Sequence, residues 1–248
     1  MAKEILRPTC LKAVTNTFCP GCLHAMAKKL VAQTLEELGI ADKTVLVLAV
    51  GCGTMGMNYW NLDFVSAAHG RAPAVATGIK RTQPDTFVFT YQGDGDLAAI
   101  GLSEIICAAN RGEKFSVIFI NNSTYGMTGG QLAPTTLVGQ KSTTTPAGRN
   151  PETEGYPLDM CKLLSTLQAP SFIARCAMNS PANVRKAKDA IRKAFQYQLD
   201  GKAFSFVELL SNCVTNWNMS PLDTLEHIDK VTSKVFSLGI YRDVDEGV

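Results

Sequence analysis

The residues that could do chemistry in this chain begin with two aspartates set among glycines, in the run "YQGDGDLAAI" at positions 91–100. Asp94 and Asp96 come soon after the apolar run "TFVF", which has the character of a buried strand. The glycines let the chain turn sharply and let another molecule approach the main chain, and a carboxylate at such a turn can hold a hard cation. The pattern therefore indicates a cation site at the end of a strand.

A second group of possible oxygen ligands lies one strand–helix–strand unit after Asp94 in the sequence. Asn122 lies 28 residues after Asp94, so the two loops can be neighbours. A carboxylate, an amide oxygen and the main-chain carbonyl of Thr124 would give Mg²⁺ three hard ligands and leave its other positions to phosphates and water. The helix that begins near Asp96 offers free N–H groups to anionic oxygens. We expect a magnesium ion that carries a diphosphate.

Four cysteines form a third chemical feature. "FCPGC" places Cys19 and Cys22 three positions apart at the start of a helix, while Cys52 in "VGCG" and Cys213 in "SNCV" stand singly in other loops. The close pair fits a redox dithiol, half of a zinc site or part of an iron–sulfur site. Zinc lacks a second close pair, a thioredoxin-like dithiol lacks a preceding strand, and Leu23 stands where a c-type haem site needs histidine. The four cysteines could hold a [4Fe-4S] cluster if the N-terminal segment folds over the strand ends, and spacing alone leaves the choice open.

The bulk composition limits the function classes. The chain has 248 residues, 46% of them apolar, and a formal net charge of +2 with no basic block interleaved with aromatics, which argues against nucleic-acid binding. "MAKEILRPTC" lacks the apolar core of a signal peptide, and no apolar run approaches the ~20 residues that span a bilayer. We therefore expect a cytoplasmic protein with reduced cysteines and no membrane contact. Cys107, Cys161 and Cys176 are expected to be small buried hydrophobes, and Cys10 has no assigned role.

Strand-like and helix-like patterns alternate along the chain. The expected strands are 44–50, 86–91, 115–120, 171–177 and 204–210, and the expected helices are 24–38, 72–82, 96–110, 159–168 and 182–199. The alternation predicts an α/β fold with a doubly wound, mostly parallel sheet and helices on both faces. We expect one domain over 1–248, with an N-terminal cysteine-bearing segment at about 1–23 and a C-terminal extension at about 214–248.

The unusual residues fall where strands end. "GCG", "GDGD", "NNSTYG" and "SNCVTNW" each follow an expected strand, and open parallel sheets bind ligands outside the carboxyl ends of their strands. The aperiodic stretch 123–157 is long for a connection, which is typical of a functional loop. We expect these loops to converge on one crevice.

Two further features near the first strand need interpretation. "GCGTMG" fits the G-x-G-x-x-G pattern of nucleotide-binding folds, but the next segment, "MNYWNLDFVSAAHG", is expected to be a weak helix with no acidic residue about 20 positions on at a strand end. A Rossmann site is therefore disfavoured. His69, which precedes "GRAPAVATG", is interpreted as a donor near the diphosphate or a substrate carboxylate rather than as an ordinary structural histidine.

Taken in order, "FCPGC", "VGCG", "AAHGRAPAVATGIK", "GDGDLAAIG", "NNSTYGMTGGQLAPTT" and "NCVTNW" resemble the β subunit of the 2-oxoacid:ferredoxin oxidoreductases along nearly the whole chain. The resemblance implies a thiamine-diphosphate-binding fold in which Asp94, Asn122 and the carbonyl of Thr124 are the Mg²⁺ ligands. It implies thiamine-diphosphate contacts at Gly51, Cys52, Gly53, His69, Gly95, Asp96, Gly126 and Met127, with His69 in a catalytic role. It also implies [4Fe-4S] ligands at Cys19, Cys22, Cys52 and Cys213.

The function that the resemblance implies is coenzyme A-dependent oxidative decarboxylation of a 2-oxoacid, with electrons passed through the cluster to ferredoxin, in anaerobic metabolism. "TTTPAGR" and "NCVTNWNMSP" look more like the 2-oxoglutarate and 2-oxoisovalerate members than the pyruvate members. A glutamate of another subunit activates the cofactor in this family, so the chain should be inactive alone. The expected partners are an α-type subunit with the second thiamine-binding domain, together with γ and ferredoxin-like δ subunits.

Two functions of other classes stay open on the sequence. A non-redox thiamine-diphosphate decarboxylase or carboligase would use the magnesium site but would have no use for four cysteines. A non-enzymatic electron-transfer or zinc-binding subunit would use the cysteines alone. Metal content and retained thiamine diphosphate distinguish these functions from the oxidoreductase.

Overall fold

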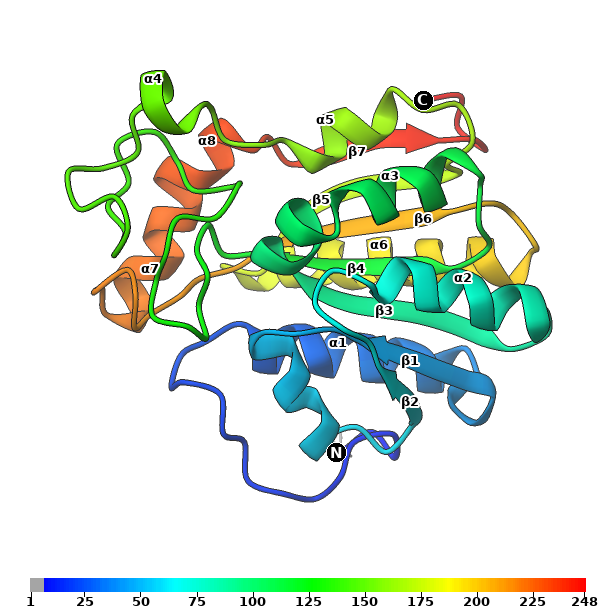
Figure 1. Cartoon of the computed structure of the whole chain (residues 1–248). Helices are drawn as coiled ribbons and strands as arrows, with labels where there is room; N and C mark the ends of the chain where they lie inside the picture. The colour runs from blue at the N-terminus through cyan, green and yellow to red at the C-terminus, as the bar shows by residue number, and fades with distance from the viewer. Residues whose placement is uncertain (1–6) are drawn as a thin grey trace.

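A seven-stranded sheet with helices on both faces forms the core of the protein, as the computed structural model shows for residues 7–248 (Figure 1). The spatial order of its strands is β2-β1-β3-β4-β6-β5-β7. Six strands pair in parallel, and β7 pairs antiparallel with β5. The strands are β1 (Thr44–Leu48), β2 (Asp63–Ser66), β3 (Phe87–Gly93), β4 (Ser116–Asn121), β5 (Phe172–Ala177), β6 (Ser205–Leu210) and β7 (Gly239–Asp243). The predicted α/β fold with a mostly parallel sheet is confirmed.

Five of these strands coincide with the apolar runs of the sequence, whereas β2 and β7 do not. The prediction of a weak helix in "MNYWNLDFVSAAHG" is wrong, because β2 occupies its centre and pairs with β1 from Val45↔Asp63 to Leu48↔Ser66. Every residue of β2 is exposed, so the strand shows no buried face in the sequence. Main-chain hydrogen bonds to β1 hold it at the edge of the sheet.

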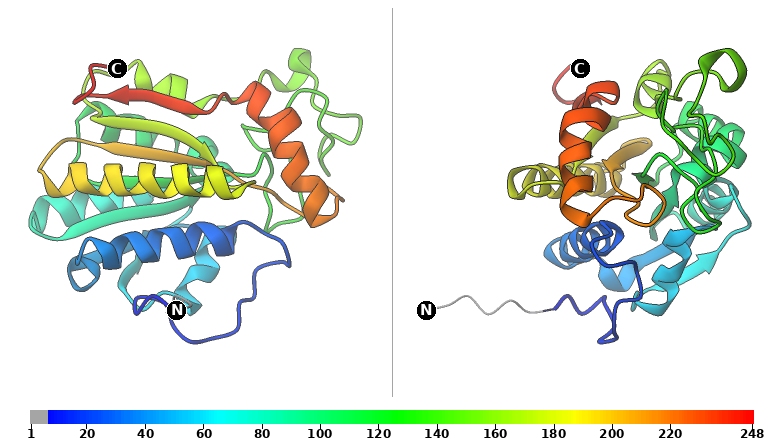
Figure 2. Two further views of the ribbon diagram at one scale, coloured as in Figure 1. Left: turned by 180° about the vertical axis from the view of Figure 1, so that it is seen from behind. Right: turned by 90° about the vertical axis from the view of Figure 1, so that its left-hand side faces the viewer.

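Helices cover the two faces of the sheet in separate sets. Helix α1 (His24–Glu37) and helix α6 (Pro181–Leu199) pack side by side on one face, as the left view of Figure 2 shows. Helices α2 (Ala72–Thr82), α3 (Leu102–Asn110) and α5 (Met160–Ser165) pack on the other face. Alternate strand residues divide accordingly, since Ile118 of β4 faces the first set and Val117 faces the second.

Helix starts follow ordinary capping chemistry. The hydroxyl of Ser180 accepts a hydrogen bond from the Asn183 N–H, and Pro181 takes the first position of α6. Asp159 caps α5 in the same way by accepting from the Lys162 N–H. The shorter helices are α4 (Pro151–Glu154), α7 (Pro221–His227) and α8 (Ser233–Val235), with 3₁₀ turns at Ala41–Lys43 and Cys52–Asn58 and π-helical turns at Gly95–Ile100 and Ile228–Thr232.

The cysteines outside the four loop positions are placed differently from one another. Cys161 is buried and Cys176 is half-buried against the core, whereas Cys107 is exposed. The expectation that Cys107 is buried is therefore wrong, because α3 turns Ala108 and its neighbour toward the sheet. Cys10 is buried, and its thiol donates to the carbonyl of Ala32 at 3.4 Å.

The connections after β1, β3, β4 and β6 leave the same edge of the sheet because these strands are parallel. Figure 1 shows the long segment after β4 and helix α7 gathered at that end of the molecule. The first six residues of the predicted cysteine-bearing segment lie outside the described part of the chain. Within residues 7–248, no helix combines the length and the apolar character that crossing a membrane requires.

Candidate functional site

A pocket at the carboxyl ends of the strands brings together loops that are far apart in sequence. Its walls come from the segments after β1, β2, β3 and β4 and from the start of α1. The predicted magnesium and thiamine-diphosphate residues all line it, namely Gly51, Cys52, Gly53, His69, Asp94, Gly95, Asp96, Asn122, Thr124, Gly126 and Met127. Cys19, Cys22 and Cys213 lie outside its lining.

The side-chain amide of Asn122, the Asp94 carboxylate and the Thr124 carbonyl converge in the pocket. The amide oxygen of Asn122 lies 3.2 Å from Asp94 Oδ1 and 2.7 Å from the carbonyl oxygen of Thr124. A half-turn of the amide would let its NH₂ group donate to both oxygens, and a cation among the three oxygens would satisfy the orientation with the carbonyl inward. A carboxylate, an amide oxygen and a main-chain carbonyl are ligands that Mg²⁺ prefers. The donor set therefore fits a magnesium ion.

Asp94 is held in place from two sides. It is buried at the start of the π-helical turn, where its Oδ1 accepts from the Gly95 N–H at 2.8 Å, and its Oδ2 accepts from the Thr135 hydroxyl at 2.5 Å. Burial raises the pKa of the Asp94 carboxyl to about 6, while the hydrogen bonds from Thr135 and from main-chain N–H groups oppose the rise. A nearby divalent cation would favour the ionised form.

The chain bends sharply between Asn122 and Thr124. Ser123 has a φ of 58°, a left-handed conformation that is uncommon for a residue other than glycine. The side-chain carbonyl of Asn121 accepts from the Ser123 N–H at 3.2 Å, and the Trp217 indole donates to the carbonyl of Asn122 at 3.1 Å. This turn places the Asn122 side chain and the Thr124 carbonyl on the same side of the chain.

Asp96 joins the loop after β2 to the loop after β3. Its buried carboxylate accepts from the Gly70 N–H at 2.7 Å and from the Gln92 amide at 2.5 Å. His69 Nδ1 lies 2.6 Å from Asp96 Oδ1, although the ring nitrogen is not aligned for a hydrogen bond. Asp96 is thus engaged by groups of the protein and lies against His69 at the pocket wall.

Two of the four loop cysteines lie beside Gly126, and the other two lie near them. A Cβ atom added at Gly126 would lie 3.3 Å from Cys52 Sγ and 3.7 Å from Cys213 Sγ. The pKa of Cys22 is raised to about 11 and that of Cys52 to about 12. Burial is the main cause, and the nearby thiols of the set, Cys19 among them, contribute to the rise. All four thiols are free.

Hydrogen-bond donors already face two of these sulfurs. Asn216 donates to Cys213 Sγ at 3.2 Å, and Thr215 donates to Cys19 Sγ at 3.5 Å. Across residues 7–248, no three His, Cys, Asp or Glu side chains are arranged to hold one metal ion. A four-iron cluster is wider than a single ion, so its ligand sulfurs stand farther apart, and the donor set is compatible with such a cluster.

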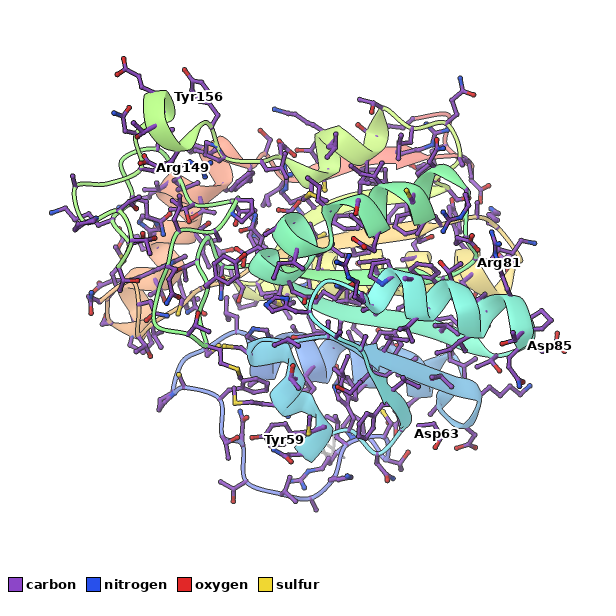
Figure 3. The ribbon with its side chains drawn as sticks, viewed as in Figure 1. Tyr59, Asp63, Arg81, Asp85, Arg149 and Tyr156 are labelled. Carbon is purple, nitrogen blue, oxygen red and sulfur yellow. The ribbon has the colours of Figure 1, made fainter. Side chains whose placement is uncertain are left out.

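Several residues of the site have no signal in the sequence. Arg149 is buried in the long loop (Figure 3), where its guanidinium donates to main-chain carbonyls, including those of Pro134 at 2.8 Å and Thr136 at 2.7 Å. These carbonyls flank Thr135, so Arg149 holds the turn that reaches Asp94. Only the loop's length and its aperiodic composition indicated a function for this segment.

A second unpredicted feature is a buried pair beside the cysteines. His24 Nδ1 lies 2.9 Å from the hydroxyl of Tyr91, and His24 lines the pocket. Burial lowers the pKa of His24 to about 4 and raises the pKa of Tyr91 above its usual range, so both side chains are neutral near pH 7. The position of His24 next to "FCPGC" was the only sequence signal for it.

Comparison with known proteins places this geometry in a family. The model of the thiamine pyrophosphate enzyme C-terminal TPP-binding domain, thiamine pyrophosphate being thiamine diphosphate, matches residues 45–209. The ketoisovalerate oxidoreductase subunit VorA of Methanothermobacter thermautotrophicus is 49% identical over 226 residues, which is 91% of this chain and 47% of the relative. The 2-oxoglutarate synthase subunit KorB of Archaeoglobus fulgidus is 38% identical over 85% of this chain and 74% of the relative. The chain thus spans about half the length of the ketoisovalerate oxidoreductase subunits that it matches.

The fold is also shared with a solved structure. A chain of the 2-oxoglutarate:ferredoxin oxidoreductase from Magnetococcus marinus, solved with 2-oxoglutarate, coenzyme A and succinyl-CoA bound, superimposes with a TM-score of 0.78. The superposition covers 98% of this chain and 87% of the other chain at 24% sequence identity, so it establishes a common fold. The chain matches the thiamine-diphosphate domain, is 38–49% identical to KorB and VorA, and has the same fold as the solved structure. It therefore belongs to the thiamine-diphosphate-binding subunits of the 2-oxoacid oxidoreductases.

Proposed function

We propose that this chain binds thiamine diphosphate through Mg²⁺ in an enzyme that oxidatively decarboxylates a 2-oxoacid with coenzyme A and passes the electrons to ferredoxin. The observation that carries the proposal is the convergence of the Asp94 carboxylate, the Asn122 amide and the Thr124 carbonyl near four free cysteines. A non-redox decarboxylase explains the oxygens but leaves the cysteines without a use.

The roles of the chain's own residues follow from their chemistry. Asp94, Asn122 and the Thr124 carbonyl would hold Mg²⁺, which neutralises a diphosphate, and Gly51, Gly53, Gly95 and Gly126 would let the cofactor approach the main chain. When bound, thiamine diphosphate supplies the carbanion chemistry that decarboxylates 2-oxoacids. His69, which lies against Asp96, would donate a hydrogen bond to the diphosphate or to the substrate carboxylate. Cys52 and Met127 would contact the cofactor from the walls of the pocket.

Electron transfer would use the neighbouring cysteines. Cys19, Cys22, Cys52 and Cys213 would hold a [4Fe-4S] cluster, and Cys52, which also lines the cofactor pocket, would bring it close to the reacting centre. The raised pKa values of Cys22 and Cys52 mean that both thiols are protonated before the cluster forms, so assembly releases protons.

A branched-chain 2-oxoacid such as 2-oxoisovalerate is the substrate that we propose first, with 2-oxoglutarate second. The relatives named ketoisovalerate oxidoreductase subunits share 48–49% identity with the chain, and the 2-oxoglutarate synthase subunits share 35–38%. Among the described residues that line the pocket there is no lysine or arginine to pair with a distal carboxylate. Both observations favour a substrate with an apolar end.

The active enzyme would need other subunits. Val50 and Met127 are exposed apolar side chains at the pocket, which suits a protein partner that covers them. We propose an α-type subunit with the second thiamine-binding domain at this face, joined by γ and ferredoxin-like δ subunits. One sheet holds every described strand and the thiols are free, which supports a single domain over 1–248 that works in the reducing cytoplasm.

The test is anaerobic purification of the chain with its native partners, followed by assay of low-potential dye reduction with pyruvate, 2-oxoglutarate and 2-oxoisovalerate. We expect a brown complex with iron and acid-labile sulfide, and dye reduction that requires coenzyme A and is fastest with 2-oxoisovalerate. Release of CO₂ without dye reduction would establish the non-redox decarboxylase instead. Zinc without retained thiamine diphosphate would establish a non-enzymatic subunit.

A further inference from the structure

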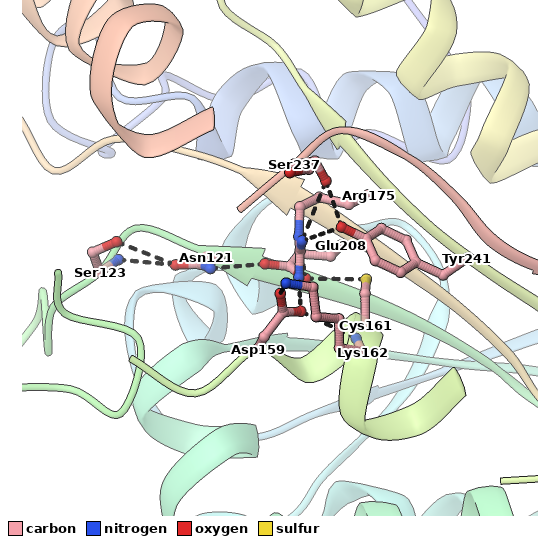
Figure 4. A network of polar contacts seen from close by, with 9 residues as sticks. All are labelled: Asn121, Ser123, Asp159, Cys161, Lys162, Arg175, Glu208, Ser237 and Tyr241. Atoms are coloured by element: carbon pink, nitrogen blue, oxygen red, sulfur yellow. Dashed lines mark hydrogen bonds and ion pairs between the residues drawn. The ribbon is translucent and has the colours of Figure 1, made fainter. Parts of the chain in front are cut away.

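A buried ionic network spans β6 and β5, next to β4, the strand that leads into the proposed cation loop (Figure 4). Glu208 of β6 and Arg175 of β5 form an ion pair with 2.8 Å between Oε2 and Nε, and their side chains are 1% and 0% exposed. The Nε–H bond is not aligned with the carboxylate, so the contact is mainly one of charge. Arg175 also pairs with Asp159 and donates to the Tyr241 hydroxyl at 2.6 Å. Because buried ion pairs are weak stabilisers, stability alone is a poor explanation for this network.

One oxygen of Glu208 points away from Arg175 toward the cation loop. Oε2 faces Arg175 and also accepts from the Cys161 thiol at 3.1 Å, whereas Oε1 accepts from the side-chain NH₂ of Asn121 at 2.7 Å. A carboxylate can only accept, so the NH₂ group of Asn121 must face Glu208. The orientation of the Asn121 amide is therefore determined by the carboxylate.

The oriented amide in turn shapes the turn between the cation ligands. With its NH₂ on Glu208, Asn121 presents its carbonyl to Ser123, where it accepts from the N–H at 3.2 Å and from the hydroxyl at 3.4 Å. Ser123 is the residue with positive φ that reverses the chain between Asn122 and Thr124. Figure 4 shows the contacts running from Arg175 through Glu208 and Asn121 to Ser123.

We propose that Glu208 is a positioning residue for the cation site: through Asn121 it holds the Ser123 turn that aims the Asn122 amide and the Thr124 carbonyl at the ion. The inference rests on the proposed magnesium and thiamine-diphosphate function. Glutamine at this position would keep its carbonyl on the Arg175 cation and turn its NH₂ group toward the NH₂ group of Asn121. Glu208→Gln should therefore release the Asn121 amide with little change in volume.

The test measures Mn²⁺ bound in the presence of thiamine diphosphate, by the electron paramagnetic resonance of the free ion, in the chain purified with its partners. Glu208→Gln and Asn121→Ala should each weaken Mn²⁺ binding about tenfold, which is about 1.4 kcal/mol. The Mn²⁺ affinity of the double variant should equal that of the more weakly binding single variant, because both substitutions act through the same turn. Asn121→Ala leaves the Arg175–Glu208 pair intact, so it tests the idea even where Glu208→Gln folds poorly.

Asp159→Asn is the matched control, because Asp159 contacts Arg175 but makes no contact with Asn121. It should lower the thermal midpoint and change Mn²⁺ affinity by less than about twofold. Parental Mn²⁺ affinity in Glu208→Gln and Asn121→Ala, or an equal loss in Asp159→Asn, would overturn the positioning role. Failure of the parent protein itself to bind Mn²⁺ with thiamine diphosphate would overturn the proposed function as well, so the two failures are distinguishable.

Discussion

Thr135 donates a hydrogen bond to Asp94 Oδ2 at 2.5 Å, across 41 positions of the chain. The hydroxyl belongs to the long loop, and the carboxylate belongs to the turn after β3. The contact offsets part of the desolvation that raises the pKa of Asp94. The long loop therefore helps to keep the carboxylate in the ionised form that a cation requires.

Replacing Thr135 by valine tests this relationship with almost no change in shape. We expect Thr135→Val to weaken Mg²⁺-dependent binding of thiamine diphosphate about tenfold, because a hydrogen bond to a charged group is removed. Isothermal titration of thiamine diphosphate at several Mg²⁺ concentrations measures the change. Thr135→Ser keeps the hydroxyl and should stay within about twofold of the parent; an equal loss in both variants would refute the role of the hydroxyl.

Arg149 is expected to hold the turn that carries Thr135. Its guanidinium satisfies several main-chain carbonyls, among them those of Gly155 at 2.7 Å and Tyr156 at 2.8 Å. A lysine ammonium cannot reach the same set, so Arg149→Lys should lower the free energy of unfolding by about 3 kcal/mol and weaken cofactor binding. Urea unfolding measures the first effect.

The control for this variant is an arginine at the surface. Arg81 pairs with Glu113 at 2.5 Å, and its side chain is 61% exposed (Figure 3). Arg81→Lys should change stability by less than about 1 kcal/mol, because the Arg81 side chain is mostly exposed and Arg111 also pairs with Glu113. If Arg149→Lys were as mild as Arg81→Lys, the loop would not depend on the guanidinium.

Asp94 should stabilise the cation complex and destabilise the metal-free chain. Its pKa is about 6 in the folded protein against 3.8 in the ordinary carboxyl, so the folded state binds more protons between these values. The stability that Asp94 contributes is full below about pH 4 and is lost as the pH rises through about 6. The free energy of unfolding of Asp94→Asn should therefore be about 2–3 kcal/mol higher than that of the parent near pH 7 in the presence of a chelator.

Urea unfolding of both proteins at about pH 4 and about pH 7 checks the sign of this effect. The advantage of Asp94→Asn should be largest at the higher pH and should shrink toward about pH 4, where the parent carboxyl is protonated. Mg²⁺ with thiamine diphosphate should stabilise the parent and leave the variant unchanged. A pH-independent difference between the two proteins would show that burial does not control this carboxyl.

The sequence predicts the strands whose faces are buried, but it does not predict the two strands at the edges of the sheet. The central strands are apolar runs because both of their faces are covered. The meeting of Asp94 and Asn122 in one pocket follows from the length of one strand–helix–strand step. Strand β2 was missed because it is exposed along its length and is held by main-chain pairing with β1. Strand β7 was missed because it is a short antiparallel edge, with Ile240 exposed.

Within the site, the residues that hold other residues in position could not be predicted from the sequence. Arg149 binds carbonyl groups, which every residue has, so no pairing pattern points to it. Glu208 lies in an apolar strand and meets Asn121 across 87 positions, and only the sheet order brings β4 beside β6. Sequence patterns identify ligands by their type, whereas the groups that position those ligands depend on the tertiary fold.

The cysteines give a prediction that separates the cluster from the magnesium site. Cys213→Ser should lose iron and acid-labile sulfide, yet retain Mg²⁺-dependent thiamine-diphosphate binding, because Cys213 lies beside Gly126 but outside the lining of the cofactor pocket. Serine is similar in size but is a poor ligand for iron in such clusters. Cys107→Ser, at an exposed position on α3, should keep full iron content. Iron and sulfide analysis with parallel calorimetry of thiamine diphosphate measures both effects; full iron in Cys213→Ser would remove it from the ligand set, and loss of cofactor binding would show that the two sites are not separable.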